Sequence, residues 1–469
     1  MTQIKSIINN EHLENIAVIT QNGEHYTYQM LSNDVSKIAR SFKSRSLLFI
    51  IGSNDYSCLV HYLAALESDT VVLFLSASIA AAQLKTLLYT YRPEYVLAKA
   101  REGVFSQYDV LRYHEQYQFL GRTLSKPYIL HSNLAFLAST SGSTGSPKLV
   151  RFSKQNLFSN VQAIKEYLSI SQQERAIVHL PISYSYGLSI VNSHLSAGAS
   201  IYLTNETIME KSFWENMAAH QITSFSGVPF HYESLLRMKV DSISLPYLKT
   251  MTQAGGKLTR RHLMKMQKLT RKLGINFWVM YGQTEASPRI SYLRPSDLKE
   301  HLGSIGKAIP GGKLVIHDKK GNDITESGEI GELVYRGENV CLGYAENFSD
   351  LSKGDENQGF LKTGDLASCK QGYFYIEGRL KRFIKIFGNR ISLSHVETTL
   401  QNLGYESIAF GTDNTLNIAI VKSKDFDVQT LKKTLGDLFS INYTTIQIQL
   451  IARIPRLENG KVDYQCLMK

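Results

Sequence analysis

Residues 140–148, with the sequence TSGSTGSPK, have the composition of a loop that binds phosphate. The glycines let the backbone approach a ligand closely, the hydroxyl groups can donate hydrogen bonds, and Lys148 adds a positive charge. These are the groups that cradle a polyphosphate. The loop is not a Walker A motif, because no Gly-Lys-Ser or Gly-Lys-Thr closes it. A solvated Ser/Gly linker is the alternative, and the apolar segments LAFLAS and LVRF on either side favour the phosphate loop.

A second polar segment, YGQTE at residues 281–285, directly follows the apolar run INFWVM. In an open parallel sheet, ligands bind at the carboxyl ends of the strands, which is where this segment would lie. The carboxylate of Glu285 suits a hard cation that bridges phosphate oxygens. Alone, the pentapeptide would be an ordinary polar loop, but its order after residues 140–148 favours one shared site.

The elements that must position these loops are short apolar runs alternating with helical patterns. Strands are expected at residues 46–52, 70–76, 94–98, 175–180 and 199–204, and helices at 56–68 and 159–167. Strands separated by helices imply crossover connections and a largely parallel sheet that is buried on both faces. From Gly303 onward, Gly-rich turns between short strands predict a β-rich subdomain of hairpins.

The predicted fold class is α/β, with a domain boundary near residues 380 and 381. Residues 1–380 would form a large N-terminal domain of parallel sheets flanked by helices, together with the β-rich subdomain. Residues 381–469 would form a small α+β domain, because the pattern there is strand, helix and strand.

In this order, these segments resemble the motifs of the acyl-adenylate-forming superfamily, which includes acyl-CoA synthetases, luciferases and peptide-synthetase adenylation domains. Residues 140–148 are similar to its TSG[ST]TGxPKG loop, and residues 281–285 to its YGxTE motif. The resemblance implies that Tyr281 and Gly282 line the adenine site, that Thr284 contacts phosphate and that Glu285 helps to hold Mg²⁺. The loop residues it implies for ATP are Thr140, Ser141, Gly142, Ser143, Thr144, Gly145 and Lys148.

Three further segments extend the resemblance along the chain. Residues 253–257 (QAGGK) are similar to the segment beside the adenine, and imply that Gly255 and Gly256 lie against the base. Asp365, in a Thr-Gly-Asp tripeptide, matches the residue that contacts ribose, and Arg379 matches a residue that reaches the ribose or phosphate. Residues 454–463 (IPRLENGKVD) resemble the PRTxxGKVDR element. That element implies that Lys461 contacts both the acid's carboxylate and the nucleotide.

The same resemblance places a hinge at Lys381, which implies that residues 381–469 form a mobile domain. It also implies that Lys385 and Gly388 face the active site during thiol transfer. The implied catalytic residues are Lys461, Glu285, Thr144 and Lys385. The sequence departs from the family pattern at Leu149, where a glycine is usual, and at Lys154, where a histidine is common. The C-terminal domain is also shorter than is typical, which bears on how a thiol partner docks.

The resemblance also bears on the acid. Amino-acid activators carry an aspartate that pairs with the substrate ammonium, and Gly187 stands at that position here. A buried ammonium without a counter-charge is costly, so a small or medium carboxylic acid is favoured over an α-amino acid. The pocket residues expected from the pattern are Tyr184, Ser226, Gly227, Val228 and Trp278.

Three functions stay open at this point. The first is an ATP-dependent, AMP-forming acid–coenzyme A ligase. The second is a stand-alone ligase that loads the phosphopantetheine of an acyl carrier protein. The third is a non-enzymatic family member, which is opposed by the retained residues Lys148, Glu285, Asp365, Arg379 and Lys461.

Composition bears on the binding partners and on the cellular location of the protein. The formal net charge of +11 fits an anionic ligand, or equally a solubility role. No basic run is interleaved with aromatic residues, so nucleic acid is not expected as a partner. The four cysteines lie far apart without a CxxC pair, and the N-terminus has no secretory apolar region, so the cytoplasm is expected. The longest apolar stretch, residues 71–82, is too short to insert across a membrane.

Overall fold

The computed structural model describes residues 7–9, 11–43, 45–123, 129–139, 148–238, 245–380, 382–386, 389–412, 414–422, 427–457, 460 and 462–468. Two compact units are present. The first comprises Met1–Leu314 and Tyr335–Leu361, and the second comprises Val315–Val334 and Lys362–Lys469. The second unit therefore includes strands before residue 380. The domain boundary near residue 380 stays a prediction, and Lys381 lies outside the described residues.

A nine-stranded sheet in the first unit has the strand order β16-β15-β14-β13-β12-β10-β11-β1-β2. All neighbours from β1 to β14 along this order are parallel, as the crossover pattern predicts. The strands are β1 (Ile16–Thr20), β2 (His25–Thr27), β10 (Arg175–Val178), β11 (Ser200–Leu203), β12 (Ser224–Gly227), β13 (Thr250–Gln253), β14 (Asn276–Gly282), β15 (Arg289–Leu293) and β16 (Lys307–Ala308).

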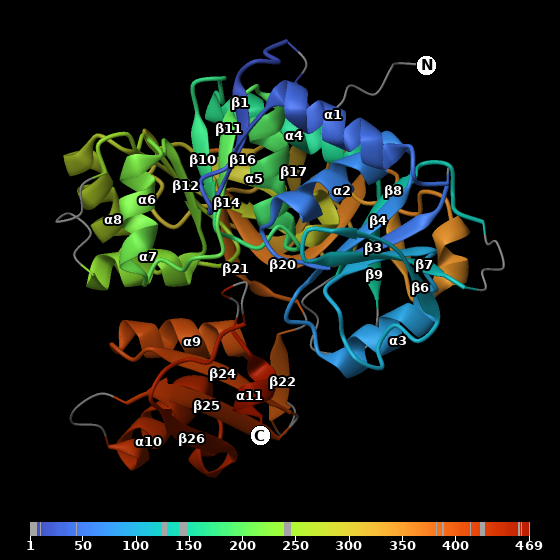
Figure 1. Cartoon of the computed structure of the whole chain (residues 1–469). Helices are drawn as coiled ribbons and strands as arrows, with labels where there is room; N and C mark the ends of the chain where they lie inside the picture. Colours follow the sequence, from blue (N-terminus) through green and yellow to red (C-terminus); the bar gives the residue numbers. More distant parts are fainter. Residues whose placement is uncertain are drawn as a thin grey trace. The chain divides into compact units, whose positions relative to one another are not determined.

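Helices cover both faces of this sheet (Figure 1). On β14, Phe277 packs on Tyr232 of α7, whereas the next residue, Trp278, packs on Tyr167 of α4. Successive side chains of a strand point to opposite faces, so α7 and α4 lie on opposite sides. The helices of this unit are α1 (Tyr28–Ala39), α2 (Tyr56–Glu67), α3 (Ala81–Tyr91), α4 (Lys154–Leu168), α5 (Ser185–Ser196), α6 (Lys211–Ala219), α7 (Pro229–Arg237) and α8 (Arg260–Leu273).

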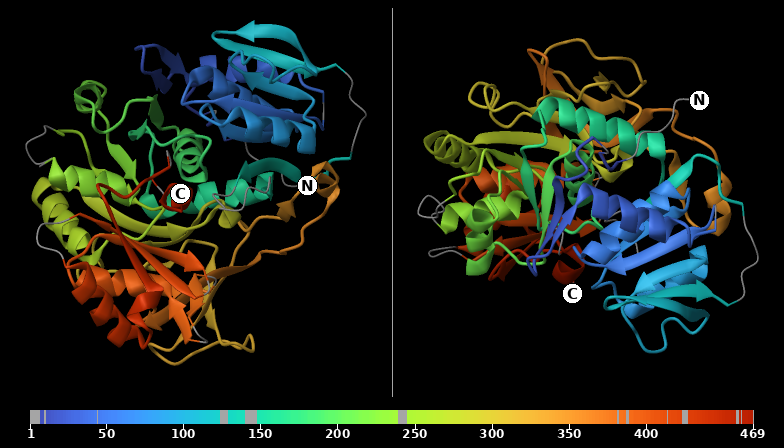
Figure 2. Two further views of the ribbon diagram at one scale, coloured as in Figure 1. Left: turned by 90° about the horizontal axis from the view of Figure 1, so that it is seen from below. Right: turned by 45° about the horizontal axis from the view of Figure 1, so that its top comes forward.

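An eight-stranded sheet completes the first unit, in the order β19-β9-β8-β4-β3-β5-β7-β6, with the β6–β7 hairpin at one edge (Figure 2). Its central strand β3 is buried throughout, because Leu84, Leu87 and Leu88 of α3 pack into the same core as alternate residues of β3. The strands are β3 (Leu47–Gly52), β4 (Val71–Ser76), β5 (Tyr95–Ala98), β6 (Tyr108–His114), β7 (Tyr117–Arg122), β8 (Leu134–Ser139), β9 (Leu149–Ser153) and β19 (Gly343–Ala345).

The second unit contains most of a four-stranded sheet, β17-β18-β20-β21. Its strands are β17 (Lys313–His317), β18 (Ile330–Arg336), β20 (Phe360–Lys370) and β21 (Tyr373–Arg379). The β20–β21 hairpin turns at Gln371 and Gly372, whose φ angles are 54° and 78°. Two positive φ angles are what a tight two-residue hairpin requires. The predicted hairpins are therefore present.

The rest of the second unit is a small α+β arrangement. Helices α9 (Leu393–Asn402) and α10 (Val428–Phe439) pack on one face of a three-stranded sheet, where Leu416, Ile418 and Ile420 are buried. That sheet contains β24 (Ser407–Thr412), β25 (Thr415–Val421) and β26 (Ile446–Ile451), and the remaining elements are the hairpin β22 (Phe383–Ile386) with β23 (Asn389–Ser392) and helix α11 (Tyr464–Leu467). The predicted α/β fold class is confirmed, and the mobility of the C-terminal domain stays a prediction. Among the described residues, no helix is both long enough and apolar enough to cross a membrane.

Candidate active site

The candidate phosphate loop connects two antiparallel strands of the eight-stranded sheet. Ser139 at the end of β8 pairs with Leu149 at the start of β9. The loop residues Thr140, Ser141, Gly142, Ser143, Thr144 and Gly145 lie outside the described residues. Lys148 is described, and its Nζ atom lies 3.8 Å from the centroid of the Tyr344 ring, which is the geometry of a cation–π contact.

Tyr344 joins Lys148 to the candidate metal ligand Glu285. Its ring contacts Lys148, and its hydroxyl group donates a hydrogen bond of 2.9 Å to Oε1 of Glu285. Burial, and then the neighbouring Glu285 charge, raise the pKa of the Tyr344 phenol, so the hydroxyl remains a donor at neutral pH. Two residues that the sequence predicts separately are thus brought together by a third.

Tyr281 and Gly282 are the last residues of β14, and Thr284–Ala286 follow as a short 3₁₀ helix that carries Glu285. At Gly282, a Cβ atom would lie 1.7 Å from the carbonyl oxygen of Pro288, so only glycine fits. The chain that follows is held by the buried residue Asn339, whose Nδ2 donates a 2.6 Å hydrogen bond to the carbonyl oxygen of Ala286. Glu285 is therefore carried on backbone that is fixed on both sides. Tyr281, at the end of β14, and Thr284, at the start of the 3₁₀ helix, are both half-buried.

The candidate adenine segment lies at the same edge of the nine-stranded sheet. Gln253 ends β13 and pairs in register with Val279 of parallel β14, so both strands lead to one edge. The side chain of Gln253 donates 2.8 Å to the carbonyl oxygen of Gly256 and closes the turn. Gly255 has a φ of 78°, and a Cβ there would lie 3.1 Å from the Tyr184 hydroxyl.

The expected acid pocket is next to this turn. Ser226 and Tyr186 both hydrogen-bond the Thr252 hydroxyl group, at 2.8 and 2.9 Å. A Cβ on Gly255 would also lie 3.0 Å from Val228, so Tyr184 and Val228 both adjoin Gly255. Tyr167 and Tyr292 stack on each other, and Trp278 packs against both rings, on the same sheet face as α4.

Gly187, on the first turn of α5, has no room for a side chain. A Cβ atom there would lie 2.3 Å from the carbonyl oxygen of Pro181 and 2.7 Å from that of Leu180. Both contacts are with backbone, which cannot move aside as a side chain could. An aspartate at this position would require the chain before α5 to shift.

In the second unit, the structure pairs Asp365 with Arg379. The two residues face each other across the β20–β21 hairpin, and Nε of Arg379 donates 2.7 Å to Oδ1 of Asp365. The Asp365 side chain is 4% exposed, whereas that of Arg379 is 62% exposed. Thr363 fixes the turn, because its hydroxyl oxygen accepts from the amide of Asp365 at 3.1 Å.

Lys385 lies on β22 and is exposed to solvent. Gly388 and Lys461 lie outside the described residues. The chain on either side of Lys461 forms a small hairpin, in which Arg456 pairs with Val462. Tyr464, which follows this hairpin, accepts a 2.7 Å hydrogen bond from Arg382, so the segment is anchored to the unit's core.

The donor groups are consistent with magnesium bound through substrate. Among the described residues, no cluster of three or more His, Cys, Asp or Glu side chains could hold a metal by itself. Mg²⁺ is commonly held by one or two carboxylates together with substrate phosphates. Glu285, which Tyr344 connects to Lys148, fits that arrangement.

Sequence reasoning missed Tyr344 and Asn339. Asn339 precedes β19, and Tyr344 lies on it. β19 pairs with β9, and Tyr344 lies opposite Val150 in the register. No local motif marks either residue. Only the pairing of two strands far apart in the chain would have pointed to them.

Comparison with known proteins points to one family. Residues 8–345 match the family described as AMP-binding enzyme. A long-chain-fatty-acid–CoA ligase of Yersinia pestis is 30% identical over 307 residues, covering 63% of this chain and 53% of that ligase. The non-ribosomal peptide synthetase CmlP of Streptomyces venezuelae is 25% identical over 346 residues, covering 72% of this chain and 34% of that protein. The chain thus spans about half or less of the length of these two relatives.

Solved structures share the fold over almost the whole chain. The o-succinylbenzoate CoA synthetase of Bacillus subtilis, in complex with the acyl-adenylate intermediate OSB-AMP, superposes with a TM-score of 0.78 at 21% identity. That superposition covers 97% of this chain and 96% of the synthetase. The same synthetase in complex with ATP and magnesium ion gives a TM-score of 0.77 at 20% identity, with 97% of each chain covered.

Proposed function

Because the chain belongs to the AMP-binding enzyme family, we propose that it activates a carboxylic acid with ATP and transfers the acyl group to a thiol. In the first step, a carboxylate oxygen attacks the α-phosphorus of ATP, forming the acyl-adenylate and releasing pyrophosphate. In the second, a thiol sulfur attacks the acyl carbon, AMP leaves, and the thiol proton is released.

The observation that carries this proposal is the contact series from Lys148 through Tyr344 to Glu285. It supports the proposal because Lys148, the last residue of the candidate phosphate loop, is connected through one side chain to a carboxylate suited to Mg²⁺. Glu285 would help to hold Mg²⁺, which would supply positive charge to offset that of the phosphates. Lys148 would add a fixed positive charge beside the same phosphates.

The other residues have roles that follow from their chemistry. Tyr281, Gly255 and Gly256 would hold the adenine, and Thr284 would contact phosphate. Asp365 can accept from both ribose hydroxyl groups, because a carboxylate has several lone pairs. Arg379, which holds Asp365, would contact ribose or phosphate.

The lack of space at Gly187 supports an acid without an α-ammonium group. A counter-charge cannot be placed there without moving the backbone of Leu180 and Pro181. An ammonium in that part of the pocket would then be unpaired, which is costly.

We propose coenzyme A as the thiol, supported by the named CoA ligase among the relatives. The alternative is the phosphopantetheine of an acyl carrier protein, which the likeness to a peptide synthetase supports. Thioester formation with coenzyme A and with a pantetheinylated carrier protein, measured side by side, separates the two.

Residues 381–469 are proposed to move as a domain about Lys381, presenting Lys461 for adenylation and Lys385 for thiol transfer. Such a rotation needs large backbone dihedral changes at the hinge, which proline prevents by fixing φ. Lys381→Pro should leave pyrophosphate exchange in place and abolish thioester formation. Wild-type levels of both activities would place the hinge elsewhere.

The test of the proposed function is ATP–pyrophosphate exchange over a library of carboxylic acids. Exchange that requires both an acid and Mg²⁺ supports it. Hydrolysis of ATP without exchange, for every acid, would contradict it.

A further inference from the structure

Two arginines in the first unit are almost completely buried, and they are paired very differently. Arg151 is 0% exposed and Arg289 is 3% exposed. Arg151 has an ion pair of 2.5 Å with Glu356, and its guanidinium also donates to the backbone carbonyl oxygens of Leu342, Tyr344 and Gly354. This is how a buried arginine is stabilised when its role is structural, because a carboxylate compensates its charge.

Arg289 has no such compensation. One of its terminal nitrogens donates 2.9 Å to the Tyr167 hydroxyl and lies 3.1 Å from the Met280 sulfur, and the other donates 3.2 Å to the Ser189 hydroxyl. Its Nε has no hydrogen-bond partner, and among the described residues no carboxylate lies within 4.0 Å of its guanidinium group. A buried charge held only by neutral groups is costly to keep.

Arg289 is connected to the expected acid pocket through Tyr186 and Thr252. Its guanidinium carbon lies 5.1 Å from the centroid of the Tyr186 ring, and the Tyr186 hydroxyl group contacts Thr252, which also bonds Ser226. Met280, which Arg289 contacts, lies two residues before Gly282 on β14. Met280 is therefore about 7 Å from the end of β14 at which the YGQTE segment lies. With the reacting carboxylate at that end of β14, the guanidinium group of Arg289 lies on the side where the far end of the acid would be.

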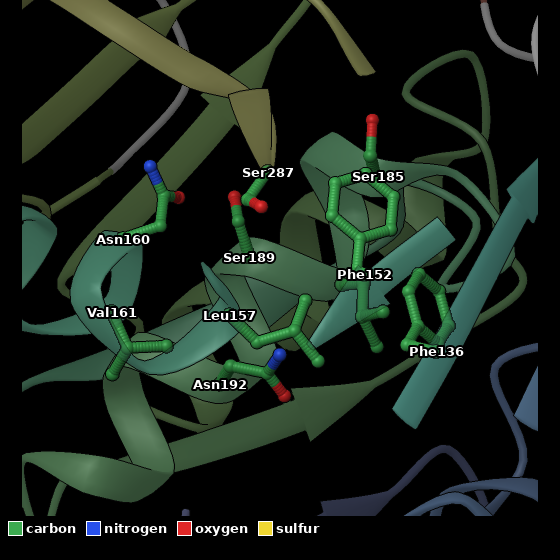
Figure 3. A pocket seen from close by; sticks show the side chains of 10 residues that line it. Phe136, Phe152, Leu157, Asn160, Val161, Ser185, Ser189, Asn192 and Ser287 are labelled. Carbon is green, nitrogen blue, oxygen red and sulfur yellow. The ribbon is translucent and has the colours of Figure 1, made fainter. Parts of the chain in front are cut away.

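A small cavity beside Ser189 does not supply the missing charge. Ser189 and Ser287 line it together with Asn160 and Asn192, between α4 and α5 (Figure 3). Its volume is about 20 Å³, which is room for about one water molecule. A water there can hydrate the Ser189 hydroxyl group, but it carries no negative charge.

We propose that Arg289 binds a second anionic group on the acid substrate, so that the preferred substrates are dianionic, such as dicarboxylic acids. This inference rests on the proposed function, because it assigns the far end of the same acid pocket. The ligand's carboxylate would accept from the guanidinium group and provide the counter-charge that the protein itself lacks at Arg289.

The test compares matched acids on matched variants. Each α,ω-dicarboxylic acid is paired with its monomethyl ester, which has the same chain length and one charge less. Wild type, Arg289→Met and the control Arg151→Met are assayed by ATP–pyrophosphate exchange and by the shift in melting temperature that each acid causes without ATP. For wild type, kcat/KM should favour at least one dicarboxylate by about 30-fold or more, since losing one partner of a buried charge pair has effects of that size.

Arg289→Met should lose the kcat/KM preference for the dicarboxylate and the rise in melting temperature that the dicarboxylate causes. Without any acid, its melting temperature should equal that of wild type, because methionine needs no counter-charge. Arg151→Met should melt at a clearly lower temperature. Equal responses to both acids of every pair in wild type, or a preference unchanged in Arg289→Met, would overturn the inference. So would a fall in melting temperature in Arg289→Met as large as in Arg151→Met. Exchange with monocarboxylates alone would overturn this inference and leave the proposed function standing. Dicarboxylate binding without any exchange would instead refute the proposed function.

Discussion

Asp365→Asn tests the ribose contact with the least disturbance to the fold. The substitution keeps the shape of a side chain that is 4% exposed and removes its charge. The partner in the native ion pair, Arg379, is 62% exposed and stays hydrated when the carboxylate is neutralised. The free energy of unfolding should therefore fall by about 1 kcal/mol or less.

The effect on ATP should be much larger than the effect on folding. A hydrogen bond to a charged acceptor contributes about 1.5–3 kcal/mol and one to a neutral acceptor about 0.5–1.5 kcal/mol. For two ribose hydroxyl groups, the difference is about 2–3 kcal/mol, or about 30- to 150-fold in ATP affinity. ATP affinity and melting temperature are measured on one preparation, with ATP, 2′-deoxyATP and 3′-deoxyATP.

Wild type should discriminate against both deoxynucleotides, and Asp365→Asn should lose most of that discrimination. Unchanged discrimination in the variant would refute the ribose assignment. A collapsed melting temperature with normal ATP affinity among the folded molecules would show that Asp365 is structural.

Three other perturbations have defined outcomes. Tyr344→Phe keeps the ring on Lys148 but removes the hydrogen bond to Glu285, so the Mg²⁺ concentration needed for half-maximal exchange should rise about 10- to 100-fold; an unchanged Mg²⁺ dependence would count against Glu285 as the ligand. Lys461→Ala should raise the activation free energy of adenylation by about 3–4 kcal/mol, while transfer from supplied acyl-adenylate survives. Equal losses of rate in both half-reactions would contradict the role of Lys461. Burial lowers the pKa of His61 to about 3 and that of His194 to about 4, from 6.5, so the unfolded chain binds more protons below pH 6.5. The free energy of unfolding should be unaffected by these groups above pH 6.5. Below it, the free energy should fall toward pH 4 by about 1.4 kcal/mol per pH unit for each histidine, and a flat pH profile in urea unfolding would refute this.

Local patterns predicted much of the fold because the strands are short apolar runs bounded by clear turns. The run expected at residues 46–52 is β3, and the run at 70–76 is β4, each within one residue at its start. The helix expected at 159–167 begins earlier, at Lys154. Its N-cap is Ser153, whose hydroxyl accepts from the amide of Asn156, and this polar first turn lacks the apolar periodicity that signals a helix.

Motifs predicted the separate parts of the site, but not the contacts that join them. Lys148 and Glu285 could be named from their motifs, whereas Tyr344 between them depends on the pairing of β19 with β9. In the sequence, Arg289 is recognisable only as a positively charged residue that follows the YGQTE motif. Its burial, and the lack of a carboxylate beside it among the described residues, arise from packing against α4 and α5.

The central claim is that the acid's own oxygen attacks the α-phosphorus of ATP. An active acid found in the exchange screen, labelled with ¹⁸O in its carboxylate, tests this directly when the released nucleotide is analysed by mass spectrometry. We expect AMP that carries one ¹⁸O atom after acyl transfer, together with unlabelled pyrophosphate. Release of ADP with ¹⁸O in inorganic phosphate, or of AMP without label, would contradict it.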